Sequence, residues 1–197
     1  MEISREILIL SGVGYVVGGI PTGYLLAKYI RGVDIRTFGS GNIGATNVKR
    51  VLGTKLGALT LILDILKSYA ILWAAKALQV EPHGLYLMAY AILLGNCFSL
   101  FLKGKGGKGV ATSFGIYLAL APSLAGIGGL FYGAGIGIFK VSAAGSLLAH
   151  VVIPVIAYFQ YDSLFPALTL AMSLLIILRH RPNISDLYEK FCKNCKK

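Results

Sequence analysis

Residues 39–50 form a glycine-rich segment whose side chains could bind an anion together with a hydroxyl group. Glycines allow positive φ and a close approach of the backbone to a ligand, and Ser, Asn and Thr supply neutral hydrogen bonds. Arg50 can hold a phosphate or a carboxylate through two parallel hydrogen bonds. A flexible basic loop would explain Lys49 and Arg50 but not the many Asn and Thr residues. The positions that could contact a substrate are Ser40, Gly41, Asn42, Thr46, Asn47 and Arg50.

A second segment, residues 103–109, alternates lysine and glycine and runs directly into an apolar stretch. Glycines that lead into a helix N-terminus can present backbone N–H groups to an anion, and the helix dipole adds to the attraction. The segment is not a Walker A loop, because Val110 and Ala111 follow Gly109 where that motif requires Lys and Ser or Thr. A charged hinge would need only one glycine and one lysine. We therefore predict anion binding by Lys105, Gly106, Gly107, Lys108 and Gly109.

The third unusual segment is Arg179-His180-Arg181-Pro182-Asn183-Ile184, at the end of the last apolar block. An imidazole at this point could donate or accept a hydrogen bond with a reacting group. A basic collar at a membrane interface explains the segment equally well when it is considered alone. We also include Ser142 among the predicted substrate-binding residues.

The rest of the chain indicates a helical membrane protein that holds these segments at one surface. Of the 197 residues, 56% are apolar and only 14% are charged, which excludes a typical soluble domain and a disordered chain. About 20 apolar residues cross a bilayer as a helix, and the alternating strands of an outer-membrane barrel are not visible. We predict one domain, residues 1–197, with seven spans. They cover residues 7–30, 56–80, 85–102, 110–121, 123–139, 141–159 and 164–178.

Basic residues give the predicted direction of insertion. Fifteen of the nineteen Lys and Arg residues follow spans one, three, five or seven, whereas the turns at residues 81–84, 122 and 160–163 contain none. By the positive-inside rule, the N-terminus is outside and the C-terminus is cytoplasmic. A single span over residues 110–139 would place Lys140 and the basic tail outside, so we predict a break at Pro122. Residues 110–121 could alternatively form a half-helix that lines a cavity.

Two further features lie inside predicted spans. Asp64 and Lys67 are three residues apart on one helix face and can pair, and we expect a structural pair rather than a catalytic one. His150 is expected to be packed and hydrogen-bonded. The isolated CxxC formed by Cys192 and Cys195 lacks the additional ligands that a zinc site normally has, so we predict no metal.

Taken in order, these segments resemble the acyl-phosphate-dependent glycerol-3-phosphate acyltransferases of bacterial membranes. The resemblance rests on residues 40–50, 105–112 and 180–184, and on residues 20–27 in the first span. It implies transfer of a fatty acyl group from acyl phosphate to glycerol 3-phosphate, giving lysophosphatidate, at the cytoplasmic face of the bacterial inner membrane. It further implies that Ser40, Arg50, His180 and Asn183 are needed for activity and that residues 106–109 bind phosphate. The expected partners are the two substrates and membrane lipid, with no cofactor and no nucleic acid.

The sequence departs from the family pattern at Asn96, where a histidine is expected, and at Asp186, where a basic residue is usual. We interpret position 96 as structural. A coenzyme-A-dependent acyltransferase would often carry His-x-x-x-x-Asp, which none of the three histidines begins. The alternative that remains is a transporter or channel for organic anions, although its polar residues would be expected deep in the bilayer rather than at one surface.

Overall fold

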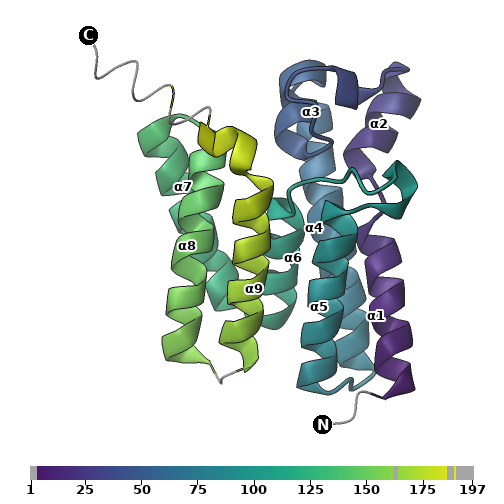
Figure 1. Cartoon of the computed structure of the whole chain (residues 1–197), viewed down its shortest axis with the longest axis vertical. Helices are drawn as coiled ribbons and strands as arrows, with labels where there is room; N and C mark the ends of the chain where they lie inside the picture. Colours follow the sequence, from purple (N-terminus) through teal and green to yellow (C-terminus); the bar gives the residue numbers. More distant parts are fainter. Residues whose placement is uncertain (1–3, 162–163, 186–188, 190–197) are drawn as a thin grey trace. The chain divides into compact units, whose positions relative to one another are not determined.

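The computed structural model describes residues 4–161, 164–185 and 189, and it divides the chain into two compact units, Met1–Gly126 and Ile127–Lys197. The described residues form α-helices and short 3-10 helices and contain no strand (Figure 1). The prediction of one domain over residues 1–197 stays a prediction. The tail residues Asp186, Cys192 and Cys195 lie outside the described residues.

The first unit begins with the first predicted span, which the structure forms as two helices rather than one. The chain leaves the helical conformation at residues 19–21, where Pro21 has no backbone N–H to donate. A short helix then follows the Ser40 segment, which we had treated as a loop. The helices are α1 (Arg5–Gly18), α2 (Thr22–Arg31), η1 (Ile35–Thr37), α3 (Ala45–Leu52), α4 (Thr54–Ala77), α5 (Pro82–Cys97), η2 (Leu100–Leu102) and α6 (Val110–Leu120).

Glycines allow the helices of the first unit to approach closely. A Cβ on Gly18 of α1 would collide with the backbone of Ile92 in α5, and one on Gly95 would collide with the carbonyl of Tyr15. Gly115 of α6 lies in the same way against the backbone of α4. Small residues at helix contacts are the usual means of packing within a membrane, and they make these contacts intolerant of a side chain.

The second unit contains the antiparallel helices α8 (Ser142–Gln160) and α9 (Leu164–Arg179), together with most of α7 (Pro122–Phe139). Gly135 of α7 packs against Gly145 of α8, and Tyr132 shares a hydrogen bond of 2.9 Å with Ser142. His150 is buried, and its Nδ1 lies 2.7 Å from the carbonyl of Ser146. The predicted packed and hydrogen-bonded state of His150 is therefore confirmed.

Five segments of the described chain are long and apolar enough to cross a membrane: Arg5–Arg31, Thr54–Ala77, Pro82–Leu102, Pro122–Phe139 and Ser142–Gln160. Helices α6 and α9 are apolar but shorter. The break before Pro122 is confirmed, because α6 ends at Leu120 and α7 begins at Pro122. Large apolar side chains such as Trp73 and Leu130 are exposed on the helix surfaces, as expected of helices that face hydrocarbon. The count of seven spans and the orientation of the termini stay predictions.

Candidate active site

The Ser40 loop, defined as residues 39–44, is held by the side chain of Asn47. The carboxamide Oδ1 accepts a hydrogen bond of 2.9 Å from the backbone N–H of Ser40. Its Nδ2 donates to the carbonyls of Phe38 at 3.0 Å and Asn42 at 2.9 Å, and more weakly to Ile35 at 3.4 Å. Asn47 is 1% exposed, so its amide group is committed to the fold of the loop. It positions Ser40 rather than facing the solvent.

Two glycines and an Asn turn complete the loop. Gly39 and Gly41 have positive φ values of 59° and 69°, which L side chains rarely adopt. The side chain of Asn42 accepts a hydrogen bond of 2.7 Å from the N–H of Gly44, just before α3 begins. The result is a loop that carries Ser40 exposed at its tip, followed by a helix that carries the exposed Thr46 and Arg50.

A neighbouring acidic residue, Asp34, is engaged by Arg36. The Arg36 guanidinium donates to the Asp34 carboxylate at 2.6 to 3.2 Å and stacks over the Tyr24 ring at 5.0 Å. These hydrogen bonds lower the pKa of Asp34 to about 2 and raise the pKa of Arg36. A carboxylate with so low a pKa is a poor proton acceptor at neutral pH, which argues against Asp34 as a general base.

The Gly-Lys loop, residues 103–109, is fastened to the end of α5 by backbone hydrogen bonds. The N–H groups of Gly106 and Gly107 donate to the carbonyls of Cys97 at 3.2 Å and Asn96 at 2.8 Å. These two donors therefore face the protein, and the expectation that they form an anion nest is not met. The sequence could not reveal this, because the acceptors come from the preceding helix.

The donors that the Gly-Lys loop does present lie at the start of α6 and on its lysines. Gly109 has φ of 85°, and no side chain among the described residues caps the first turn of α6, whose leading N–H groups have no partner within the helix. In that turn the hydroxyl of Thr112 is buried and makes no hydrogen bond to the described residues. Lys105 is exposed and Lys108 half-buried. Thr112 lies in the segment 105–112 that carries the resemblance, but it was not among the predicted substrate-binding residues.

Position 96, where the family pattern has a histidine, supports the Gly-Lys loop through its backbone. The carbonyl of Asn96 accepts the N–H of Gly107, and a Cβ on Gly106 would collide with this carbonyl oxygen. Any residue at position 96 supplies that carbonyl, so the geometry agrees with a structural reading of the departure.

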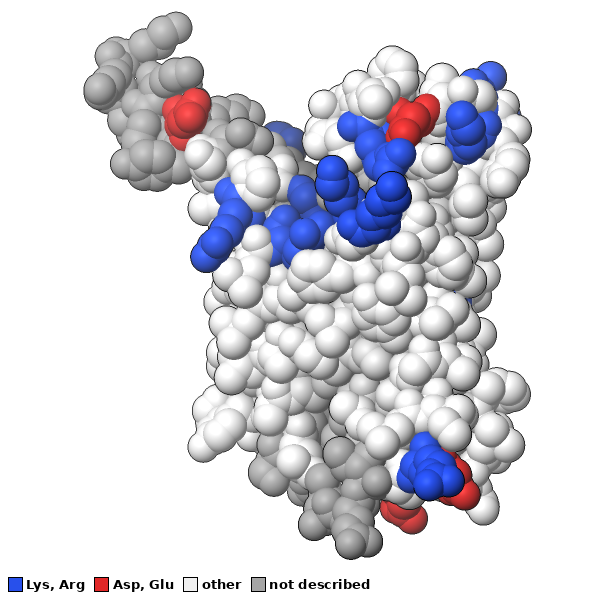
Figure 2. Space-filling view, turned by 45° about the vertical axis from the view of Figure 1, so that its right-hand side comes forward, with Lys and Arg blue, Asp and Glu red and all other residues white. Residues whose placement is uncertain are grey.

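The Ser40 loop and the Gly-Lys loop lie at the same end of the first unit. Leu102, which directly precedes the Gly-Lys loop, packs in one apolar cluster with Ile43 and Val48. The two loops and the chain on either side of them carry exposed basic residues, namely Arg31, Arg36, Lys49, Arg50, Lys55, Lys103 and Lys105. Figure 2 shows Lys and Arg side chains gathered at one end of the first unit. Their summed charge would concentrate an anionic substrate at this end.

The remaining predicted residues belong to the second unit. His180 follows α9 and is 3% exposed, and its Nδ1 lies 2.8 Å from the carbonyl of Ile176. Since a carbonyl only accepts, Nδ1 carries the proton, and Nε2 is the basic nitrogen of the neutral ring. Asn183, in the helical residues 181–185, and Ser142, at the start of α8, are both half-buried.

Comparisons with known proteins agree over nearly the whole chain. A family model described as glycerol-3-phosphate acyltransferase matches residues 8–190. The chain is 42% identical over 185 residues to a glycerol-3-phosphate acyltransferase of Anaeromyxobacter sp. (strain K), covering 91% of this chain and 92% of that one. It is 41% identical over 184 residues to one of Geobacter sulfurreducens, covering 92% and 94%.

Solved structures give the same result. The chain is similar to a crystal structure of PlsY, an integral membrane glycerol 3-phosphate acyltransferase, in its glycerol 3-phosphate form. The TM-score is 0.89 at 34% identity, and 94% of this chain and 93% of that chain are covered. The lysophosphatidic acid form of PlsY matches with a TM-score of 0.84 at 35% identity over the same shares.

Proposed function

The chain belongs to the glycerol-3-phosphate acyltransferase family, and from this membership we propose that it transfers a fatty acyl group from acyl phosphate to glycerol 3-phosphate. The products are lysophosphatidate and inorganic phosphate. The resemblance stated from the sequence motifs is confirmed, and the chain is an acyltransferase of the membrane. The transporter alternative gains no support from these relatives. The observation that carries the proposal is the match over residues 8–190, which includes all three motifs.

In the proposed reaction the glycerol hydroxyl attacks the acyl carbon of the mixed anhydride directly. The new C–O ester bond forms as the bond between the acyl carbon and the phosphate oxygen breaks. The donor is already activated, so no acyl-enzyme intermediate is required. The hydroxyl proton passes to His180 through Nε2 or to a substrate phosphate. Ser40 and Asn183 orient substrate oxygens by hydrogen bonds.

Charge stabilisation is the second part of the proposal. The leaving phosphate gains negative charge as the anhydride bond breaks, and fixed cations are most effective where charge develops. We assign this role to Arg50 and Lys108, with Lys105 and the first turn of α6 as further donors. Gly41, Asn42, Thr46, Gly109 and Ser142 complete the proposed substrate-binding residues. Gly106 and Gly107 contribute by docking the Gly-Lys loop on α5, and Asn47 contributes from α3 by holding the Ser40 loop.

We propose seven membrane spans with the N-terminus outside, so that the Ser40 and Gly-Lys loops face the cytoplasm at the bacterial inner membrane. The basic residues around both loops support this orientation. Cysteines placed at positions 42 and 106 should be labelled from the cytoplasmic side and one at position 83 from outside. Labelling of positions 83 and 106 from the same side would contradict the proposed topology.

A direct assay tests the reaction. The purified protein in detergent is supplied with glycerol 3-phosphate and either acyl phosphate or acyl coenzyme A, and lysophosphatidate and released phosphate are measured together. We expect equimolar products with acyl phosphate, none with acyl coenzyme A, and none from a Ser40→Ala variant. Turnover with acyl coenzyme A alone would contradict the proposed donor, and a stable acyl adduct on Ser40 would contradict direct attack.

A further inference from the structure

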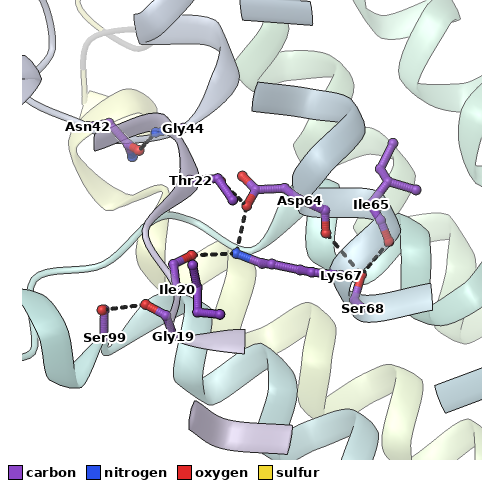
Figure 3. Close-up of polar contacts among 10 residues, drawn as sticks. All are labelled: Gly19, Ile20, Thr22, Asn42, Gly44, Asp64, Ile65, Lys67, Ser68 and Ser99. Carbon is purple, nitrogen blue, oxygen red and sulfur yellow. Dashed lines mark hydrogen bonds and ion pairs between the residues drawn. The ribbon is translucent and has the colours of Figure 1, made fainter. Parts of the chain in front are cut away.

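The break between α1 and α2 leaves backbone carbonyls without helical partners at a depth where lipid offers no hydrogen bonds. Two side chains from other parts of the first unit donate to them (Figure 3). The hydroxyl of Ser99 donates to the carbonyl of Gly19 at 2.6 Å, and the ammonium group of Lys67 donates to the carbonyl of Ile20 at 2.8 Å. Lys67 belongs to α4 and Ser99 follows α5, so the break is tied to both of these helices.

Lys67 is also ion-paired, and its partner continues the connection into α2. Its Nζ lies 2.6 Å from Oδ1 of Asp64, and the two side chains are 10% and 9% exposed. The same carboxylate oxygen accepts a hydrogen bond of 2.5 Å from the hydroxyl of Thr22, the first residue of α2. The pairing expected from the three-residue spacing is confirmed, but the pair also binds Ile20, within the break, and Thr22, directly after it.

The start of α2 in turn packs against the Ser40 loop. Gly23, next to Thr22, lies so close to the carbonyl of Ile43 that a Cβ would collide with it, and it also contacts Val48 of α3. Ile43 lies between Asn42 and Gly44, the two residues joined by the Asn turn. A continuous path of close contacts therefore runs from the buried ion pair through Thr22 and Gly23 to the loop that carries Ser40.

We propose that Lys67 and Asp64 are positioning residues for acyl transfer, which hold the start of α2 so that the Ser40 loop keeps its geometry. This inference rests on the proposed function, in which Ser40 and Arg50 contact the substrates. The pair lies inside the membrane-spanning part of α4, while the loop is reached through Gly23. The ion pair therefore affects catalysis by placing the backbone of the Ser40 loop, and it does not contact the substrate.

The same helix provides a matched control. Lys76, nearer the other end of α4, also donates to a backbone carbonyl, that of Ala119 at 3.1 Å. It joins α4 to α6, and among the described residues it makes no hydrogen bond or ion pair with α2. Lys67→Met and Lys76→Met each remove a lysine-to-carbonyl hydrogen bond from α4. Lys67→Met also breaks the ion pair with Asp64, and only this variant disturbs the path to Ser40.

The kinetic test compares these variants after each is purified as a folded protein and its melting temperature is recorded. We expect kcat to fall about 10- to 100-fold in Lys67→Met, since small displacements of reacting groups have effects of this size. Lys76→Met should keep kcat close to wild type, and Lys67→Arg should recover most of it. Equal kcat losses in Lys67→Met and Lys76→Met would overturn the proposal.

A double variant separates positioning from stability. Removing one partner of a buried ion pair destabilises a protein, whereas removing both is often close to neutral. Asp64→Asn/Lys67→Met should therefore melt near the wild-type temperature and still show the low kcat, because the carbonyl of Ile20 has lost its bond to α4 and keeps only the one from the N–H of Thr22. Recovery of both the melting temperature and kcat in the double variant would show that the pair contributes stability only and would overturn the proposal.

A spin label on the loop tests the inference independently of the reaction. Phe38→Cys, in a background with Cys97, Cys192 and Cys195 replaced, places the label at an exposed position beside the Ser40 loop. The label should be more mobile in Lys67→Met than in Lys76→Met, and identical spectra would contradict the positioning role. If the wild-type enzyme made no lysophosphatidate, the proposed function would fail while this comparison could still be read.

Discussion

The Ser40 loop and the Gly-Lys loop lie at the same end of the first unit but are built on opposite principles. The Ser40 loop is held by a buried side chain of α3, Asn47, which binds the backbone at Ser40, Phe38 and Asn42. In the Gly-Lys loop the backbone of Gly106 and Gly107 binds the backbone of Cys97 and Asn96 directly.

The two constructions respond to substitution in different ways. The first loop depends on the chemical identity of one residue, because only a carboxamide can accept from one backbone group while donating to two others. The second depends on the absence of side chains at the contact, while the residue that supplies the acceptor can vary. Asn96, at a position where the family pattern has histidine, belongs to this second type.

The largest effect should come from Asn47→Ala. The substitution removes the partner of the Ser40 N–H and of the Asn42 carbonyl, while the Phe38 carbonyl keeps its bond from the N–H of Gly41. Each group left unsatisfied costs about 1–3 kcal/mol. We expect kcat/KM to fall at least about 100-fold, since Ser40 loses its position. Asn47→Asp keeps the acceptor but loses the donors, and its activity should be intermediate. Wild-type kinetics in Asn47→Ala would show that the Ser40 loop keeps its geometry without the hydrogen bonds of the Asn47 side chain.

Gly106→Ala should have the next largest effect. Its Cβ would meet the Asn96 carbonyl oxygen and the Cys97 carbonyl, so the loop must move away from α5. We expect KM for a phosphate-bearing substrate to rise about 10-fold or more, with a smaller change in kcat. Gly133→Ala is the control, because a Cβ there has no neighbour within 4 Å. Similar kinetics in both variants would contradict the tight docking of the loop.

Lys108→Ala tests the charge of the same loop without changing its backbone. Loss of a charge-assisted hydrogen bond of about 1.5–3 kcal/mol should raise KM for a phosphate-bearing substrate about 10-fold. Inhibition by inorganic phosphate should weaken in proportion. Lys103→Ala removes a charge from the same loop outside the proposed binding set, so it should change KM much less. An equal change in both variants would indicate a general field effect.

Asn96→Ala should have a small effect, in contrast to Asn47→Ala. The substitution keeps the carbonyl that holds Gly107 and removes only the side chain. Both kcat and KM should stay within about threefold of wild type, because the loop is fastened through the backbone, and local side-chain losses of under ~1 kcal/mol correspond to such changes. A loss as large as that of Gly106→Ala would mean that the carboxamide itself acts in the reaction.

Asp34→Asn should have the smallest effect on the pH dependence of the reaction. The pKa of Asp34 is lowered to about 2 by Arg36. The stabilisation from this pair is therefore complete above the ordinary pKa near 3.8 and is lost only as the pH falls through about 2. Between pH 5 and 8 the profile of kcat/KM should be the same for Asp34→Asn and wild type. A shift of the acidic limb in the variant would show that Asp34 titrates during catalysis.

Much of the fold could be predicted from the sequence because lipid imposes a simple rule on apolar length. The block over residues 56–80 became α4, and Pro122 separates two helices as the distribution of basic residues required. The spacing of Asp64 and Lys67 predicted their ion pair, since residues three apart on a helix are neighbours.

The features that the sequence did not predict depend on hydrogen-bond partners in another element of the fold. Nothing local shows that the N–H groups of Gly106 and Gly107 donate to α5, and the identity of those acceptors decides whether a glycine loop faces a ligand or the protein. The break after Gly18 was missed for a similar reason. An apolar stretch containing Pro21 can continue as a kinked helix, and its interruption here depends on Ser99 and Lys67, which supply the missing hydrogen bonds.

The interrupted first span also bears on how the chain is assembled during synthesis. The side-chain donor to the carbonyl of Gly19 lies 80 positions later in the chain, and the side-chain donor to the carbonyl of Ile20 lies 47 positions later. When the first span leaves the ribosome, neither donor has yet been made. We therefore expect residues 19–21 to stay in a hydrated or interfacial environment until α4 and then the end of α5 are inserted. Final burial of the N-terminal span is thus a late step, set by the arrival of Lys67 and Ser99.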